Sequence, residues 1–76
     1  MSVLAEETEV GVLTNEQGTE RVLILRRPDG SFTYRRQWAD GRSWGAIGPA
    51  CGIHDSAFTA ENEARARVSW LHPIWN

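Results

Sequence analysis

Apolar and polar positions alternate through the middle of the chain in the pattern of a β-hairpin. Residues 19–27 contain the run Val22-Leu23-Ile24-Leu25, and residues 31–38 continue with phenylalanine, threonine, tyrosine and tryptophan. Apolar, β-branched and aromatic residues of this kind favour strands. Arg27-Pro28-Asp29-Gly30 joins the two runs and predicts a tight turn, because proline presets φ at the first corner and glycine adopts the left-handed conformation that closes a three-residue loop.

The predicted turn sets the register of the hairpin, because it places Arg27 opposite Ser31 and successive side chains alternate between the two faces. The further pairs are Arg26 with Phe32, Ile24 with Tyr34, Val22 with Arg36, and Glu20 with Trp38. One face is therefore mostly aromatic and aliphatic. The opposite face carries basic and polar residues around two leucines, and its members are Arg21, Leu23, Leu25, Arg27, Ser31, Thr33, Arg35 and Gln37.

Shorter strands are predicted on both sides of the hairpin. Residues 9–14 are rich in valine and leucine, and the turn-forming sequence Asn15-Glu16-Gln17-Gly18 follows them. Residues 43–47 predict a further short strand, which Gly48-Pro49 interrupts. Residues 51–53 are expected to return to the edge of the sheet.

The apolar spacing changes to three and four residues in the last third of the chain, which predicts one helix with an apolar stripe. The stripe consists of Ala57, Ala60, Ala64, Val68 and Leu71. Thr59 is the predicted N-cap, and Asp55 or Ser56 is expected to cap the turn that enters the helix. Pro73 is predicted to end the helix. Two ion pairs with the stabilising i, i+4 spacing are expected, Glu61 with Arg65 and Glu63 with Arg67.

Together these elements predict an α+β fold, in which a three- to four-stranded antiparallel β-meander packs against one C-terminal α-helix. Residues 1–8 are acidic and lack turn or cap residues, so we expect a disordered acidic N-terminus followed by a single small domain over residues 9–76. A chain of 76 residues buries only a small core, and its aromatic residues are expected to supply much of it. The aromatic residues assigned to the core on this ground are Trp38, Trp44, Trp70 and Trp75. Trp70, Ile74 and Trp75 are expected to close one end of it.

Cysteine use and hydropathy place the chain in a broad class. Cys51 is the single cysteine, which excludes an intramolecular disulfide. No apolar run reaches the length of a membrane span, and no signal peptide is evident. We therefore expect a cytoplasmic protein that does not contact a membrane.

Charge is segregated along the sequence. Residues 1–20 carry a net charge of −5, residues 21–42 carry +4, and residues 43–76 carry −1, although the whole chain sums to only −2. Six of the eight arginines lie in the middle segment, and the chain has no lysine. Exclusive use of arginine reflects either selection for planar, bidentate contacts or the codon usage of a GC-rich genome. The segregation itself favours a binding face on the hairpin.

The basic face of the hairpin predicts a non-enzymatic interaction module. The expected contact residues are Arg21, Leu23, Leu25, Arg27, Arg35 and Gln37, with Arg26 and Arg36 contributing at the edges. Leucines on a solvent-facing sheet suggest coverage by a protein partner, by a second copy of the chain, or by residues 9–14. Nucleic-acid binding through the same arginines is the alternative, because arginine contacts both phosphate and guanine.

Other sequence features give little support to catalysis or cofactor binding. Cys51 and His54 have the spacing of half a zinc site, but Asp55 and His72 do not complete a recurrent ligand pattern. The glycines between residues 41 and 52 lack the strand, loop and helix context of a phosphate-binding loop, and no lysine is present to complete one. We therefore expect no metal and no small-molecule cofactor, and we interpret Cys51 as a small buried residue.

The order of the elements resembles one known DNA-binding fold. A hairpin and a short strand precede Gly52-Ile53-His54-Asp55-Ser56-Ala57, which leads into an alanine-rich helix. This order is similar to the three-stranded-sheet-plus-helix domains of the ethylene-response type over residues 20–71. The resemblance implies a sheet packed on a helix. It does not extend to the arginine and tryptophan contact residues of that family, so it implies no function.

Overall fold

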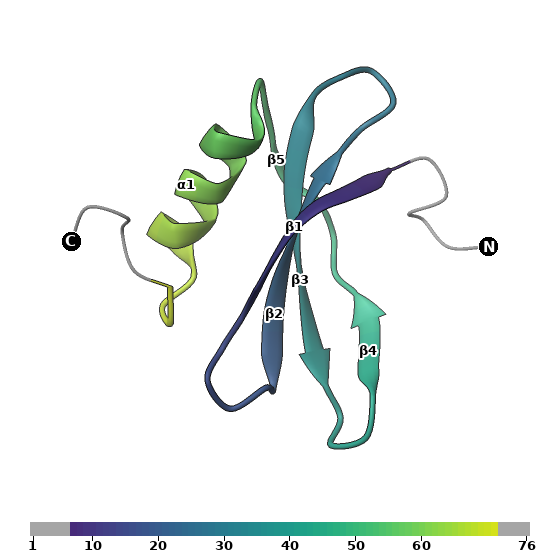
Figure 1. Cartoon of the computed structure of the whole chain (residues 1–76), viewed down its shortest axis with the longest axis vertical. Helices are drawn as coiled ribbons and strands as arrows, with labels where there is room; N and C mark the ends of the chain where they lie inside the picture. Colours follow the sequence, from purple (N-terminus) through teal and green to yellow (C-terminus); the bar gives the residue numbers. More distant parts are fainter. Residues whose placement is uncertain (1–6, 72–76) are drawn as a thin grey trace.

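The structure, a computed structural model, describes residues 7–71 of the chain. It is an α+β fold with an antiparallel sheet packed against one C-terminal helix (Figure 1). The strands are β1 (Thr8–Thr14), β2 (Glu20–Arg26), β3 (Phe32–Ala39), β4 (Trp44–Ile47) and β5 (Cys51–His54), and the helix is α1 (Ala57–Arg67).

The central hairpin has the predicted register. Every pair expected between β2 and β3 is observed, from Arg26 opposite Phe32 to Glu20 opposite Trp38. The turn closes with a hydrogen bond of 2.7 Å from the Arg27 amide to the Ser31 carbonyl. Gly30 has a φ of 88°, the left-handed conformation that this turn requires of glycine.

The central strand β3 has three neighbours. β2 lies along one side of it, and β4 and β5 share the other side (Figure 1). β4 pairs with the C-terminal end of β3 at Gln37 and Ala39, whereas β5 pairs with its N-terminal end at Phe32 and Tyr34. The sheet therefore continues past the interruption at Gly48-Pro49, as the sequence predicted.

The start of the chain is more ordered than predicted in the part that the structure describes. Residues 1–6 of the expected disordered segment lie outside the described residues. Glu7 and Thr8, which also belong to it, have defined positions, and Thr8 begins β1 opposite Arg26. No local pattern indicates these positions, because the partners of Glu7, Arg27 and Arg35, lie far away along the chain.

The predicted N-cap of the helix is wrong. Ser56 caps α1, since its hydroxyl accepts a hydrogen bond of 3.1 Å from the Thr59 amide. The helix ends at Arg67, and Val68 already has extended dihedral angles. Leu71 of the predicted stripe therefore lies beyond the helix, and Pro73 lies outside the described residues.

This cap predicts a stability difference between neighbouring positions. Replacing Ser56 with alanine removes the acceptor for the Thr59 amide and is expected to lower the free energy of unfolding by about 1 kcal/mol. Thr59→Ala is the matched control, because it leaves the cap in place and introduces a better helix former. Urea unfolding of the three proteins measures the difference, and equal losses for both variants would contradict the assignment of Ser56.

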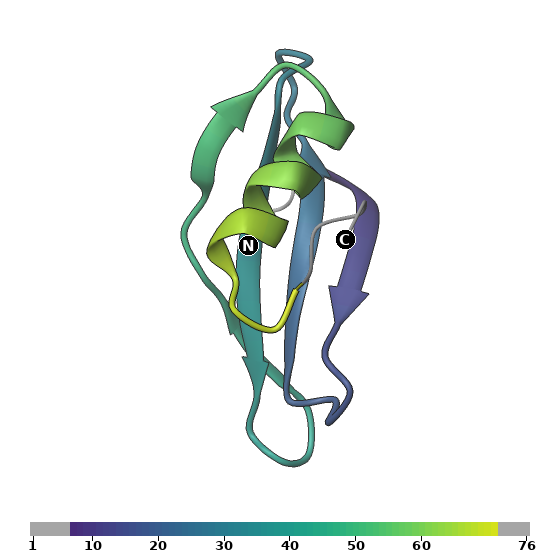
Figure 2. The same ribbon diagram turned by 90° about the vertical axis from the view of Figure 1, so that its left-hand side faces the viewer.

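The main core lies between the helix and one face of the sheet, where Figure 2 shows α1 crossing in front of β2 and β3. Ala60 and Ala64 are fully buried there, and their small side chains let the helix axis approach the sheet closely. The core cluster consists of Val22, Ile24, Tyr34, Ala60, Ala64 and Val68, with Trp70 and Leu71 packed against it. Ile74 and Trp75, also predicted for this core, lie outside the described residues.

The opposite face of the sheet also contains buried residues, and coverage within the chain was one of the three alternatives that the sequence left open for its leucines. Leu23 is 1% exposed, Leu25 is 0% exposed, and neither belongs to the cluster under the helix. Figure 1 shows β1 running obliquely to its partner β2, as in a twisted sheet. Among the described residues, no helix is long and apolar enough to span a bilayer.

Candidate functional site

The six residues predicted to form the binding face lie together on the side of the sheet away from the helix. They are not, however, an open contact surface. Leu23 and Leu25 are buried within the chain, and Gln37 is only 5% exposed. The two leucines therefore do not present side chains to a partner in this conformation, and the expectation that they face solvent is corrected.

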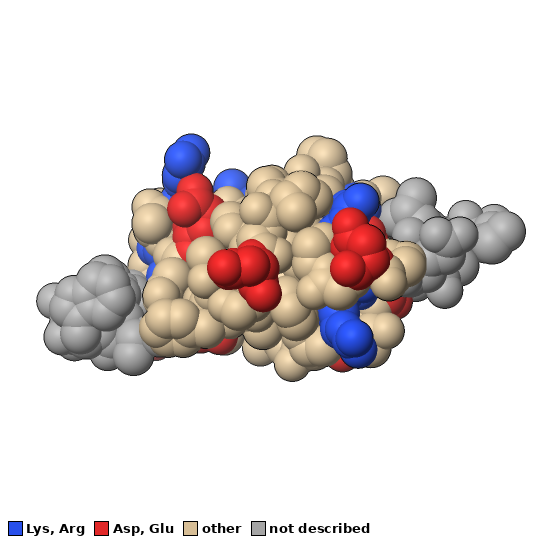
Figure 3. Space-filling model, turned by 90° about the horizontal axis from the view of Figure 1, so that it is seen from above, with Lys and Arg blue, Asp and Glu red and all other residues tan. Residues whose placement is uncertain are grey.

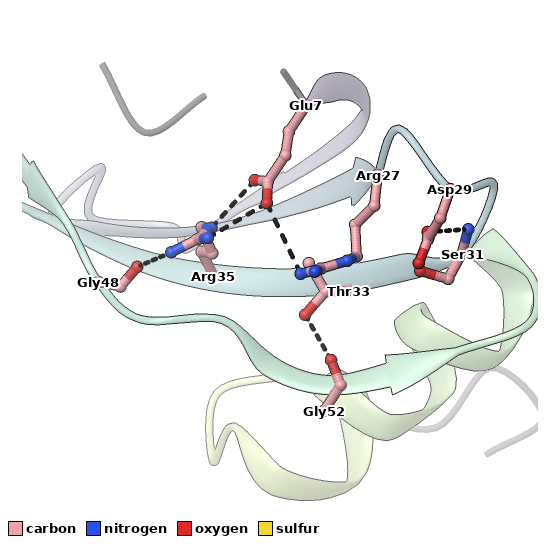
Figure 4. A network of polar contacts seen from close by, with 8 residues as sticks. All are labelled: Glu7, Arg27, Asp29, Ser31, Thr33, Arg35, Gly48 and Gly52. Carbon is pink, nitrogen blue, oxygen red and sulfur yellow. Dashed lines mark hydrogen bonds and ion pairs between the residues drawn. The ribbon is translucent and has the colours of Figure 1, made fainter. Parts of the chain in front are cut away.

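Alternate side chains of β3 hold the segment that contains β4 and β5 against this face. Thr33 donates a hydrogen bond of 2.7 Å to the Gly52 carbonyl, and Arg35 donates one of 2.9 Å to the Gly48 carbonyl (Figure 4). Gln37 continues the series with a bond of 2.6 Å to the carbonyl of Gly45. These polar residues satisfy backbone acceptors that the irregular segment cannot pair by itself.

Glu7 lies between the arginines of this face (Figure 4). Its two carboxylate oxygens accept hydrogen bonds of 3.2 Å each from the Nε and Nη2 atoms of Arg35. Arg27 approaches the same carboxylate to 3.9 Å. The side chains of Glu7 and Arg35 are only 8% and 13% exposed, so this ion pair is largely removed from water.

Arg21 and Gln37 form a second polar contact on the same face. The Nε of Arg21 donates a hydrogen bond of 2.8 Å to the side-chain oxygen of Gln37. The guanidinium of Arg21 also lies 4.2 Å from the ring centroid of Trp44, within the range of a cation–π contact. Arg21 and Gln37 thus have structural partners, and their predicted role in binding stays a prediction.

Folding brings charges that are segregated along the sequence together as ion pairs. Arg27 and Arg35 pair with Glu7, and Arg36 pairs with Glu20, so carboxylates of the acidic segment meet arginines of the basic one. Arg26 and Arg42 remain exposed, on different elements. Basic and acidic groups are interspersed on the face shown in Figure 3, without a continuous basic patch.

Trp38 is the most exposed of the described tryptophans. It lies at the end of β3, beyond the part of the sheet that the helix core covers, and it is 50% exposed. The guanidinium of Arg36 lies 4.9 Å from its ring centroid. Arg36 is itself fixed by a hydrogen bond of 2.7 Å to the Glu20 carboxylate.

Sequence reasoning missed Trp38 as a surface residue because it assigned all tryptophans to the core. The predicted register already contained the signal, since it placed Trp38 directly opposite a glutamate, Glu20. A charged residue is seldom buried unless it is paired, so a glutamate opposite Trp38 predicts the margin of the apolar core. Glu20 is buried there through its ion pair with Arg36.

Cys51 and His54 line a separate cavity of about 360 Å³ between β5 and the helix. The ring centroids of Tyr34 and His54 are 6.4 Å apart. Burial raises the pKa of the Tyr34 hydroxyl, and the nearby Cys51 thiol adds to the increase.

Within residues 7–71, no group of three histidine, cysteine, aspartate or glutamate side chains is arranged to hold a metal ion. His72, the fourth residue considered for such a site, lies outside this range.

Comparison of the sequence with protein-family models and curated proteins, and of the structure with solved structures, found no significant match.

Proposed function

We propose that the chain is a non-enzymatic interaction module that binds a protein partner through the surface around Trp38. The observation that carries the proposal is the combination of a half-exposed tryptophan with an arginine already fixed over its ring. Tryptophan and arginine dominate the binding energy of protein interfaces. This surface replaces the leucine-containing face as the place where we expect the partner to bind.

The surface around Trp38 consists of Trp38, Arg36 and Glu20, and we call it the Trp38 surface. It is organised before any partner binds. Glu20 is 8% exposed and holds the Arg36 guanidinium, so the arginine loses little side-chain freedom on binding. Because Glu20 already neutralises Arg36, the surface offers an apolar ring with a polar rim rather than a net charge. We therefore expect the partner to contribute an apolar or aromatic side chain.

Nucleic-acid binding, the alternative drawn from the sequence, receives less support. Three hairpin arginines, Arg27, Arg35 and Arg36, are engaged by carboxylates. Nucleic-acid binding requires free cations to displace counterions from phosphates. An acidic net charge of −2 and internally paired arginines both oppose that requirement.

Site-specific photocrosslinking tests the proposal in cells that express the chain natively. A photoreactive phenylalanine analogue replaces Trp38 in one version and Phe58, which is 65% exposed, in the matched control. We expect a discrete protein adduct from position 38 and not from position 58. The Trp38→Ala variant should then bind the identified partner about 30-fold more weakly by calorimetry, the loss typical of a central contact residue.

Two results would contradict the proposal. One is the same set of adducts from both positions, which would indicate random encounter with abundant proteins. The other is a partner whose affinity is unchanged in Trp38→Ala although circular dichroism shows that the variant is folded. A specific nucleic-acid adduct from position 38 would instead favour the alternative function.

A further inference from the structure

The cluster of Glu7, Arg27 and Arg35 contains two guanidiniums and one carboxylate. Arg35 takes both carboxylate oxygens in a bidentate pair, the strongest arrangement for these groups. Arg27 stays 3.9 Å from Glu7, beyond hydrogen-bond distance. Its Nε atom is buried and has no hydrogen-bond partner in the described part of the chain.

An unpaired buried N–H of a charged group is unfavourable, because the group has lost its water without gaining an acceptor. Asp29 of the adjacent turn interacts electrostatically with Arg27, but its Oδ1 atom accepts hydrogen bonds from the amide and hydroxyl of Ser31, and the turn supplies no acceptor to the Arg27 Nε. Arg27 and Arg35 can therefore bind more carboxylate oxygen atoms than the two that Glu7 provides.

Glu7 immediately precedes β1, and a register irregularity sets the first residues of that strand apart from the rest. Thr8 and Glu9 pair with Arg26 and Leu25, and the register then shifts before Gly11. This β-bulge separates residues 7–9 from the regular remainder of the strand. A short edge segment beyond a bulge opens locally at a lower free energy than the body of a sheet.

We propose that Arg27 and Arg35 form a carboxylate-binding site for an extended acidic segment of a protein partner, and that Glu7 is its intramolecular occupant. The partner segment replaces residues 7–9 as a strand beside β2, so that it takes over their backbone hydrogen bonds. Its acidic side chain then enters between the two guanidiniums. Charge complementarity selects the segment, because the site without Glu7 carries two positive charges and an unpaired donor.

This site is distinct from the Trp38 surface. By the alternation of β3, Arg35 and Trp38 lie on opposite faces of the sheet. Failure of either proposal therefore leaves the other intact.

Chemical rescue of a Glu7→Ala variant tests the site in the full-length protein. The Nε–Hε signals of Arg27 and Arg35 are followed by NMR during titration with sodium acetate, with sodium chloride at equal ionic strength as the reference. A peptide with one glutamate in an extended threonine and valine context serves as the second probe. In the variant we expect saturable shifts with both carboxylate probes, at least tenfold tighter than in the wild type, where Glu7 occupies the site. Glu63→Ala, which removes a partly exposed carboxylate that is paired with Arg67 on the helix, is the matched control and should behave as the wild type.

If Glu7→Ala does not fold in chloride, the isosteric Glu7→Gln variant takes its place, because its amide oxygen still accepts a hydrogen bond from Arg35. Shifts that acetate and chloride produce equally would overturn the proposal. So would tight binding of acetate without any binding of the peptide, since the site would then hold a free anion and no strand.

Discussion

Replacing Leu25 with alanine is expected to lower the free energy of unfolding by about 2–5 kcal/mol, the cost of truncating a fully buried leucine. Leu25 is 0% exposed, although it lies on the sheet face away from the helix. A leucine on an open sheet face would change stability by only about 0.5 kcal/mol. Urea or thermal unfolding of Leu25→Ala therefore distinguishes a second core from a solvent-facing surface.

Val12→Ala is the matched control for Leu25. Val12 pairs with Leu23 and so lies on the same face, but it is 41% exposed at the edge of the sheet. We expect this variant to lose much less stability. If Leu25→Ala proves as stable as Val12→Ala, the face is open in solution and is again available to a partner, as the sequence alone suggested.

Replacing Arg35 with methionine is expected to lower the free energy of unfolding by about 3–5 kcal/mol, because it removes one member of a largely buried ion pair. Glu7 would keep only the more distant Arg27, and the carbonyl of Gly48 would lose its donor. Since domains of this size have total stabilities of about 5–15 kcal/mol, the variant should be close to unfolding at room temperature.

Arg67→Met provides the matched control for the loss of an ion pair. Arg67 is bonded to Glu63 at 2.8 Å, but its side chain is 72% exposed. An exposed i, i+4 pair contributes only about 0.3–0.5 kcal/mol. Denaturant unfolding measures the free energy of unfolding of both variants. Equal decreases would show that the pair of Arg35 with Glu7 is as solvated as a pair on the helix surface.

Together these variants test one structural idea, that the basic face of the hairpin has an internal role. Its leucines are buried, and its polar residues hold Glu7 at the start of β1 and the segment with β4 and β5. A connected polar network of this kind fixes the path of irregular backbone. Arg35 would then have two functions, holding Glu7 in the closed state and receiving the partner's carboxylate in the proposed bound state.

The sequence by itself determined the local elements of this protein. The hairpin register followed from one turn, because a two-residue side-chain period extends a single fixed pair along the whole ladder. The helix followed from a stripe of small apolar residues, and the α+β class followed from the order of the elements. The error at the N-cap, Thr59 instead of Ser56, arose because both residue types can cap and only the backbone shows where the helix begins.

Only the tertiary structure decided which surfaces face water. Leu23 and Leu25 are buried although they lie on the face away from the helix, whereas Trp38, on the face that the helix covers in part, is half exposed. The pairing of Glu7 with Arg35 joins residues 28 positions apart, which no local pattern encodes. Alternation assigns a side chain to one face or the other, but its exposure depends on what packs against that face, and this is a property of the whole chain.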